Sequence, residues 1–315
     1  MINIAIVGYG NLGKSAFEQI SKRSDEFNFV KIFSRRDYAG GMDEMFDDIK
    51  QQKHNIDVAL FCGGSSDDAP VMVAKLNQIG VSTVDSFDNH GQIANGVYMR
   101  KVAKSAFEGR TTAIVGAGWD PGYLSLQRVL NYAILPDGTH HTFFGGETGG
   151  LSMGHSNAVR QIDGVKNAVQ LTISRKDAID KALAGEIVDK NSRHKRVCFV
   201  VAEQKNHAEI ENKILSMPDY FAGQETEVNF ISQDEFDSRF SNLTAHSGRL
   251  ISTNDNVNFN VELKTKSNMD LTASIMIAYA KANFKMQKRK LKGAFTVADV
   301  PLSYLVYAEE HFKNI

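Results

Sequence analysis

Three glycines near the start of the chain have the spacing of a phosphate-binding turn. A Gly-x-Gly-x-x-Gly pattern lies between an apolar, β-branched run at 2–7 and a segment at 14–20 with helical spacing. The first glycine makes the turn, the second lets backbone N–H groups approach a pyrophosphate, and the third lets the helix pack on the strand. Although such glycines also occur in ordinary turns, the flanking elements favour a dinucleotide site. The residues expected in it are Gly8, Tyr9, Gly10, Asn11, Leu12 and Gly13.

The residues after the second expected strand, 28–33, indicate which dinucleotide binds. NAD-binding proteins usually carry an acidic residue at this point, where it accepts the ribose hydroxyls. This chain has Ser34, Arg35 and Arg36 instead. A guanidinium presents a planar fork that pairs with phosphate oxygens. The alternative is a solvated basic turn, but the position favours a site for the 2′-phosphate of NADP.

Small residues follow the next two expected strands. The strand at 57–62 leads into glycines and a serine, which let the backbone approach a cofactor and offer a hydroxyl to its ribose or pyrophosphate. The strand at 81–85 leads into a polar segment. The further cofactor-binding residues expected here are Cys62, Gly63, Gly64, Ser65, Ser86 and Asn89.

Two aspartates follow neighbouring strands of the same expected sheet. Asp88 comes after the strand at 81–85, and Asp120 comes after an apolar strand at 111–115. Ligands of open α/β sheets bind at the carboxyl edge of the strands. A loop aspartate is often only a turn or cap residue, but each of these adjoins a large aromatic, Phe87 or Trp119. We therefore expect the pair to be catalytic.

Composition narrows the class of protein. The chain has 315 residues, of which 42% are hydrophobic, and its formal net charge is −1. This balance does not indicate a nucleic acid or an anionic membrane as partner. No apolar run reaches membrane-spanning length, and the first strand leaves no room for a signal peptide, so we expect a cytoplasmic protein. The cysteines lie in apolar runs without metal-ligand spacing, so we expect packed, reduced thiols and no metal site.

The pattern changes after residue 122. Five glycines at 145–154 predict a loop that is either a mobile lid or a place where the backbone contacts a ligand. Several strands without regular intervening helices then indicate an α+β domain with a mixed sheet. The expected fold is a Rossmann-type, doubly wound parallel α/β sheet plus this second domain. The expected boundaries are 1–120 and 121–292, with 293–315 returning to the first domain.

Four polar residues of the second half have plain structural explanations. Arg196 belongs to a basic run that could be a solvated face, and Thr172 alternates with apolar neighbours on an expected strand. His246 lies in an expected polar turn, and Asn268 precedes a long helix where it could serve near the cap. None of them would be nominated from its local pattern alone.

The chain resembles the meso-diaminopimelate D-dehydrogenase family over nearly its whole length. The first matching stretch is the glycine turn at 7–13, which many dinucleotide-binding proteins share. The others are more specific, and they lie at 32–36, 88–90, 118–122, 153–156, 194–196, 217–221, 227–231 and 293–297.

This resemblance implies an NADP-dependent, reversible oxidative deamination at the D-centre of meso-2,6-diaminopimelate, in lysine and cell-wall synthesis. It implies that Arg196, Thr172 and His246 hold the carboxylate of the L-centre and that Asn268 contacts this distal end. It also implies that Asp88 and Asp120 grip the reacting amine and that the enzyme is a homodimer. The other residues implied at the substrate are Trp119, Phe144, Met153 and Gly154.

Some positions depart from the family pattern. Phe144 stands where a tryptophan is expected, Met153 stands where some relatives have glutamine, and the glycine loop is longer. These differences bear on substrate breadth, so a broader D-amino acid dehydrogenase is one alternative. Others are a dihydrodipicolinate reductase, a sugar dehydrogenase or an inactive NADPH-binding regulator. The segment at 62–65 lacks the Glu-Lys-Pro typical of sugar enzymes, and retention of both aspartates counts against an inactive regulator.

Overall fold

The computed structural model describes residues 1–64, 68–218, 220–241, 243 and 245–306. Ser65 therefore lies outside the described residues. The chain forms two compact units: residues 1–129 join the described residues from 269 onward, and residues 130–268 form the second unit. The boundaries between these units, at 129/130 and 268/269, differ from the expected boundaries at 120 and 292. The long helix from Asn268 to Lys288 packs in the first unit, which its helical spacing alone does not reveal.

The first unit alternates strands and helices. Its elements are β1 (Ile2–Val7), α1 (Asn11–Ser21), β2 (Phe27–Phe33), α2 (Gly41–Gln52), β3 (Val58–Phe61), α3 (Ala69–Gln78), β4 (Thr83–Asp85), α4 (His90–Ala94), α5 (Val97–Gly109), β5 (Thr112–Val115), the start of α6 (Tyr123–Ile134), α11 (Asn268–Lys288) and β13 (Gly293–Thr296). Short 3-10 turns lie at Arg35–Asp37, Lys53–Asn55, Val297–Asp299 and Leu302–Tyr304.

All the strand pairs of the first unit are parallel, in the order β13-β5-β4-β3-β1-β2. The chain moves from β1 to β2 on one side and then crosses back to β3 on the other. Ligands of doubly wound sheets bind at this switch point, outside the carboxyl ends of the strands. The expected doubly wound α/β sheet is thus confirmed.

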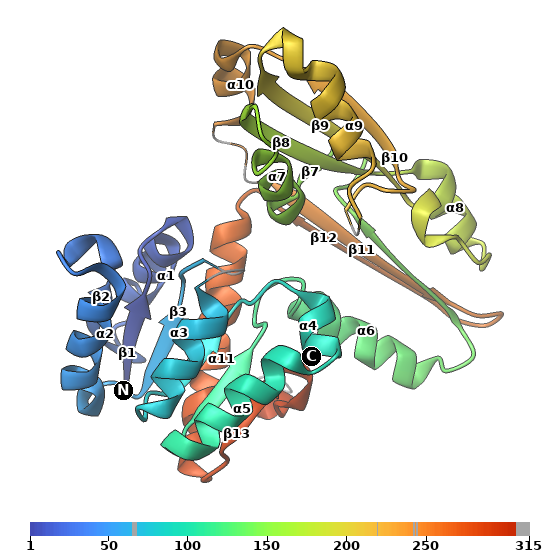
Figure 1. Cartoon of the computed structure of the whole chain (residues 1–315). Helices are drawn as coiled ribbons and strands as arrows, with labels where there is room; N and C mark the ends of the chain where they lie inside the picture. Colours follow the sequence, from blue (N-terminus) through green and yellow to red (C-terminus); the bar gives the residue numbers. More distant parts are fainter. Residues whose placement is uncertain (65–67, 219, 242, 244, 307–315) are drawn as a thin grey trace. The chain divides into compact units, whose positions relative to one another are not determined.

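Alternate residues of the strands pack in two hydrophobic layers, one on each face of the sheet. Ile4 and Ile6 pack with α1 and α11 on one face, whereas Ala5 and Val7 pack with α2, α3 and α5 on the other. Figure 1 shows this sheet with helices on both sides. In α11, Asn283 is fully buried and donates hydrogen bonds to the carbonyls of Thr83 and Thr112, so the helix is fixed to β4 and β5.

The second unit contains two sheets and their covering helices. Its elements are the end of α6, β6 (Thr139–Phe144), β7 (Gly150–Leu151), α7 (Met153–Arg160), β8 (Val165–Ser174), α8 (Lys176–Leu183), β9 (His194–Ala202), α9 (His207–Leu215), β10 (Glu225–Phe230), α10 (Gln233–Phe240), β11 (His246–Thr253) and β12 (Asn258–Thr265), with 3-10 turns at Lys190–Ser192 and Gln204–Asn206.

One sheet of this unit is mixed, with the order β10-β9-β8-β7, and the other is antiparallel, with the order β12-β11-β6. The predicted α+β class is confirmed. Two local expectations were wrong. His246 begins β11 instead of lying in a turn, because it pairs with Thr265, and the expected loop at 145–154 already contains β7 and the start of α7.

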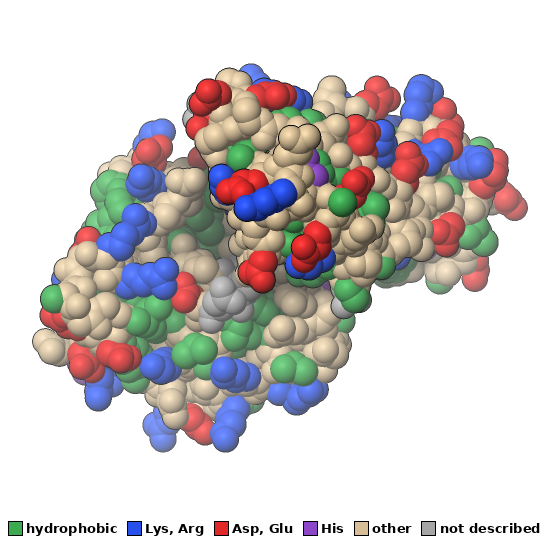
Figure 2. Space-filling model, turned by 45° about the horizontal axis from the view of Figure 1, so that its top comes forward, with side chains coloured by type: hydrophobic (Ala, Val, Ile, Leu, Met, Phe, Trp, Pro, Cys, Tyr) green, Lys and Arg blue, Asp and Glu red, His purple; other side chains and the backbone are tan. Residues whose placement is uncertain are grey.

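The surface carries charges of both signs. Figure 2 shows acidic and basic side chains interspersed over one face of the molecule. No helix among the described residues is long and apolar enough to cross a bilayer. Cys62 and Cys198 are free and buried, and desolvation raises the pKa of each thiol to about 12.

Candidate active site

The glycine turn has the close contacts that its spacing predicts. Gly8 adopts φ +102°, and a Cβ there would lie 2.6 Å from the backbone nitrogen of Gly63. A Cβ at Gly13 would lie 2.2 Å from the carbonyl oxygen of Gly8. A Cβ at Gly10 would meet nothing within 4 Å. Gly10 is the N-cap residue of α1, and no side chain caps this helix. The outer glycines are therefore required for packing, while the middle one leaves the helix N-terminus open to an anion.

A cavity of about 500 Å³ lies over this turn, at the ends of β1, β2 and β3. It brings together most of the residues predicted to bind the dinucleotide. These are Gly8, Tyr9, Gly10, Ser34, Arg35, Arg36, Cys62, Gly63 and Gly64. Asn11, Leu12, Gly13, Ser86 and Asn89 do not line it, and the side chain of Asn89 instead caps α4 by accepting the N–H of Gln92 at 2.9 Å.

The basic turn after β2 is anchored to the glycine turn. Arg36 donates to the carbonyl of Tyr9 at 3.1 Å, and Arg35 lies 3.6 Å from Asp68, an acid that we did not predict in this cavity. Ser34 is buried beside them. Two guanidinium groups thus reach the same cavity as the open helix N-terminus, which fits a dinucleotide that carries an additional phosphate.

The two predicted catalytic aspartates follow adjacent parallel strands, β4 and β5. The side chain of Asp120 is only 1% exposed and forms a two-point ion pair with Arg128, whose Nη1 lies 3.0 Å from Oδ2. Ser125 also donates to Oδ1 of Asp120, at 3.2 Å. A carboxylate oxygen accepts about two hydrogen bonds, so Oδ2 keeps one acceptor position.

Asp88 is more accessible than Asp120. The residue is exposed, yet partial desolvation of its carboxyl raises its pKa above the ordinary value. The charge of His90 opposes this rise and that of Asp120 adds to it. His90 lies 3.8 Å from Oδ1 of Asp120 through its Nε2. The loops therefore gather two carboxylates and an imidazole, which are groups able to hold an amine and move its proton.

Arg196 and Thr172 face one another on adjacent strands of the second unit, because β8 and β9 pair them directly. The Nε atom of Arg196 is buried, and it has no hydrogen-bond partner among the described residues. Desolvation lowers the pKa of this guanidinium, although arginine stays charged in proteins. A partly buried cation beside a hydroxyl is suited to a carboxylate.

The glycine loop joins His246 to this pair. A Cβ at Gly145 would lie 1.6 Å from the carbonyl oxygen of Thr172, and one at Gly150 would lie 3.0 Å from Nδ1 of His246. Gly150 also pairs with Thr172 across β7 and β8. Thr172, Arg196 and His246 therefore gather around one stretch of sheet.

Two histidines beside Arg196, the half-buried His155 and the buried His194, were not nominated from the sequence. His155 contacts the Ser152 hydroxyl at 2.8 Å through Nδ1, and Nε2 of His194 accepts the N–H of Phe144 at 2.9 Å. Desolvation, aided by the charge of Arg196, lowers the pKa of His155 to about 3 and that of His194 to about 4. Both imidazoles are therefore neutral and leave Arg196 as the cation. Both residues lie in stretches that carry the family resemblance, which was their only signal.

The remaining predicted residues take varied positions. Met153 and Gly154 begin α7, where Met153 is 47% exposed and a Cβ at Gly154 would meet nothing within 4 Å. Phe144 stacks on His194 with ring centroids 5.9 Å apart. Trp119 is buried in the loop after β5, and Asn268 is the first residue of α11.

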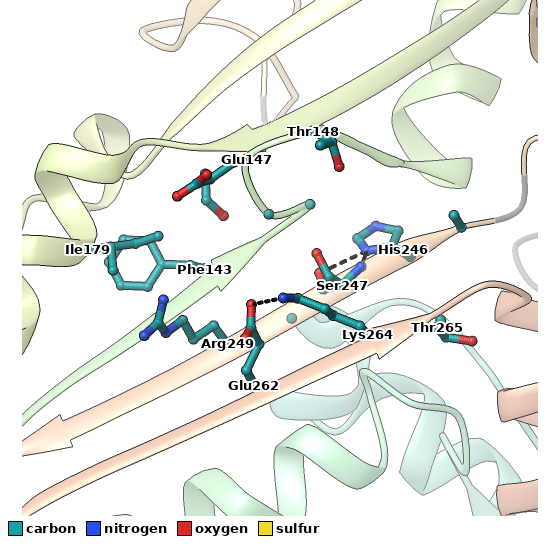
Figure 3. Close-up of a pocket in the computed structure, with 16 residues that line it drawn as sticks. Phe143, Glu147, Thr148, Ile179, His246, Ser247, Arg249, Glu262, Lys264 and Thr265 are labelled. Atoms are coloured by element: carbon teal, nitrogen blue, oxygen red, sulfur yellow. Dashed lines mark hydrogen bonds and ion pairs between the residues drawn. The ribbon is translucent and has the colours of Figure 1, made fainter.

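A second cavity, of about 510 Å³, lies beside the glycine loop. Figure 3 shows Glu147 and Thr148 of that loop on one side and Glu262 and Lys264 on the other. Lys264 pairs with Glu262 at 3.1 Å, so these two charges compensate each other. Of the predicted site residues, His246 lines this cavity, whereas Arg196 and Thr172 do not.

The chain is similar in sequence to known proteins over nearly its whole length. Residues 118–272 match the family model for the diaminopimelic acid dehydrogenase C-terminal domain. The chain is 43% identical to meso-diaminopimelate D-dehydrogenase of Corynebacterium glutamicum, over 95% of this chain and 93% of the relative. The chain belongs to the meso-diaminopimelate D-dehydrogenase family. The enzyme class expected from the sequence, an amino acid dehydrogenase, is the class of this family.

Solved structures agree with this membership. The C. glutamicum DAP dehydrogenase in complex with DAP superposes with a TM-score of 0.89 at 40% identity, covering 99% of this chain and 97% of that one. An engineered D-amino acid dehydrogenase bound to NADP+ gives a TM-score of 0.84 at 39% identity, covering 99% and 98%.

The pair between Asp120 and Arg128 generates a stability prediction for this family member. Replacing Arg128 with Met leaves the Asp120 carboxylate buried without its cation, and losing one partner of a buried pair costs about 3 kcal/mol. Urea unfolding of Arg128→Met should show this loss, and adding Asp120→Asn should recover much of it. The control is Arg175→Met, which removes a surface ion pair with Glu225 and should leave the unfolding midpoint nearly unchanged. Equal midpoints for Arg128→Met and the unaltered protein would contradict a buried pair.

Proposed function

We propose that this chain catalyses the NADP-dependent, reversible oxidative deamination of meso-2,6-diaminopimelate at its D-centre, within lysine and cell-wall synthesis. The products are L-2-amino-6-oxopimelate, which cyclises to tetrahydrodipicolinate, together with ammonia and NADPH. The observation that carries this proposal is the half-buried Arg196 side chain, whose buried Nε has no partner among the described residues. A D-amino acid dehydrogenase whose substrates lacked a distal carboxylate would have no use for this cation.

The second unit supplies the binding site for the L-centre. Arg196 donates two hydrogen bonds to its carboxylate, while Thr172 and His246 complete the contact, with Asn268 at the same end. The neighbouring His155 and His194 are neutral, so they do not add positive charge that would bind a second anion. Because the anchor lies at one end of an almost symmetric molecule, it selects which of the two amines reacts.

The first unit supplies the groups for the reacting end. Asp88 is exposed and acidic, so it accepts hydrogen bonds from the D-ammonium and takes up its proton. Asp120 adds a second carboxylate, and its ion pair with Arg128 fixes the orientation of that carboxylate. Trp119, buried in the loop after β5, excludes water from the reacting carbon. The resemblance also assigns Phe144, Met153 and Gly154, which belong to the second unit, to the substrate.

Bound NADP+ would accept a hydride from Cα of the D-centre. The amine must lose its proton before this transfer, and Asp88 is the group placed to receive it. Once Asp88 has passed that proton to solvent, Asp88 or His90 acts as the base while water adds to the substrate imine, and ammonia then leaves. Because the pKa of Asp88 is raised, its carboxylate form is lost at a higher pH than for an ordinary aspartate, and turnover falls there on acidification.

Substrate choice tests the proposal directly. Wild-type protein with NADP+ is assayed for NADPH formation with meso-, LL- and DD-diaminopimelate and with simple D-amino acids. We expect meso-diaminopimelate to be oxidised and the LL isomer, which has no D-centre, to be inert. Comparable rates with simple D-amino acids would instead favour the broader D-amino acid dehydrogenase. No oxidation of meso-diaminopimelate would refute the proposal.

In the same assay, Arg196→Met removes the carboxylate anchor. Hydrogen bonds to a charged group contribute about 2 kcal/mol, so we expect the KM for meso-diaminopimelate to rise roughly thirtyfold. Rates with a simple D-amino acid should change little. The control is Lys195→Met, whose side chain pairs with Glu227 at 2.6 Å, away from this site. An unchanged KM in Arg196→Met would show that the anchor lies elsewhere.

Cofactor preference follows from the two arginines after β2. The double variant Arg35→Ala/Arg36→Ala removes the groups proposed to bind the 2′-phosphate and should raise the KM for NADP+ by about tenfold or more. The KM for NAD+ should change much less, and Lys22→Ala, on the exposed end of α1, serves as the charge control. Parallel increases for both cofactors would remove the 2′-phosphate assignment.

We also propose that the chain forms a homodimer. Helix α6 exposes apolar side chains, among them Val129, Tyr132 and Ile134 with exposures of 49%, 50% and 61%. Exposed apolar groups clustered in this way are typical of interaction surfaces. Light scattering should give twice the chain mass of 34.8 kDa, and Tyr132→Glu should lower it. A monomer at working concentrations would end this proposal.

A further inference from the structure

Asp85 is a fully buried acid at the point where two catalytic loops leave the sheet. It is the last residue of β4, which pairs with β5 through Val84 and Ile114. Asp88 follows three residues later, and Asp120 lies beyond the end of β5. The chemistry proposed above does not use Asp85, so its burial needs another explanation.

The main-chain contacts of Asp85 reach both loops. Its Oδ1 accepts the N–H of Phe87 at 2.9 Å and the N–H of Gly116 at 3.1 Å. Its carbonyl oxygen accepts the N–H of Ala117 at 2.7 Å. The first of these bonds holds the residue before Asp88, and the other two hold the start of the loop that carries Asp120. One residue therefore connects both loops just beyond Val84 and Ile114, the last residues that pair β4 with β5.

A third element completes the cluster. The hydroxyl of Tyr98, on α5, donates to Oδ2 of Asp85 at 3.0 Å, and its ring stacks on Phe87 at a centroid distance of 3.9 Å. Phe87 and Tyr98 are each 1% exposed. Desolvation raises the pKa of Asp85 to about 6, while the N–H donors and Tyr98 oppose the rise. The group is thus mainly a carboxylate at neutral pH, as acceptance of all three donors requires.

We propose that Asp85 is a positioning residue that sets the separation of Asp88 and Asp120 by binding both of their loops through one carboxylate. This inference rests on the proposed function, in which those two acids bind the reacting amine. A purely structural role would be met at lower desolvation cost by an apolar side chain. What an apolar side chain cannot do is accept an N–H group from each loop at the same oxygen.

The test compares Asp85→Ala with Asp85→Asn. Alanine leaves the three donors unpaired, whereas the Asn oxygen still accepts both N–H groups and its amide faces the Tyr98 oxygen. A displacement of about 1 Å at a catalytic group costs about 100-fold in rate. We therefore expect kcat with meso-diaminopimelate to fall about 100-fold in Asp85→Ala and by only a few-fold in Asp85→Asn. NADPH affinity, measured by its fluorescence, should stay near wild type in both.

A double-mutant cycle separates positioning from general destabilisation. In an Asp88→Asn background, Asp85→Ala should lower kcat far less than it does in wild type, because the group being positioned is already impaired. The matched control is Asn77→Ala, which removes buried bonds to Val73, Thr83 and Thr111 elsewhere in the unit. It should lower Tm while leaving kcat unchanged at a temperature where it is folded.

If Asp85→Ala fails to fold, Tyr98→Phe takes its place in the cycle, because it removes a single donor from Oδ2. A wild-type kcat in the substituted protein, or an equal fall in the Asp88→Asn background, would overturn the positioning role. Inactivity of the wild-type protein toward meso-diaminopimelate would instead count against the proposed function, so the two failures are distinguishable.

Discussion

Strands of a parallel sheet leave backbone hydrogen-bonding groups without ladder partners where they end, and these groups must be satisfied in another way. In the first unit the chemistry is built on that requirement. Beyond β1, the N–H groups at the start of α1 have no side-chain cap and are offered to a phosphate. Beyond β4 and β5, the loop N–H groups are taken by Asp85. At this edge, the N–H groups beyond β1 stay open for the cofactor, whereas N–H groups beyond β4 and β5 are bonded to Asp85 and hold the loops of the acids in place.

The charged residues of the site differ in how the protein compensates their charges. Asp120 is held by Arg128, Arg35 lies near Asp68, and Asp85 is satisfied by neutral donors. In the second unit, Arg196 has two neutral histidines nearby and forms no ion pair with an acid in the part of the chain that the structure describes. Arg196 therefore keeps its charge available for a carboxylate of a ligand.

The sequence predicted the elements that have strong local signals. The glycine turn, the basic turn after β2 and the loop acids have the expected neighbours, because strand–turn–helix units place them whatever the rest of the chain does. It did not predict α2, α6, α7, α8 or α10, each of which has 8 to 12 residues. Because α6 was missed, Arg128 was missed too: only a helix beginning at Tyr123 brings it back to Asp120. Asp85 had no signal at all, since a single acid at a strand end is common and its partners are main-chain atoms. The packing of α11 on the first sheet, and so the domain boundary, depends on contacts between residues about 200 positions apart, such as Asn283 with Thr83.

The partly buried guanidinium of Arg196 also affects the stability of the ligand-free protein. A partly desolvated charge that has no ion-pair partner among the described residues lowers the stability of the ligand-free fold, and a bound carboxylate relieves that penalty. Exchange of this residue for an apolar one is therefore favourable for folding in the absence of substrate. An uncharged side chain at this position would meet no stability barrier, so ligand binding, and not folding, accounts for the arginine.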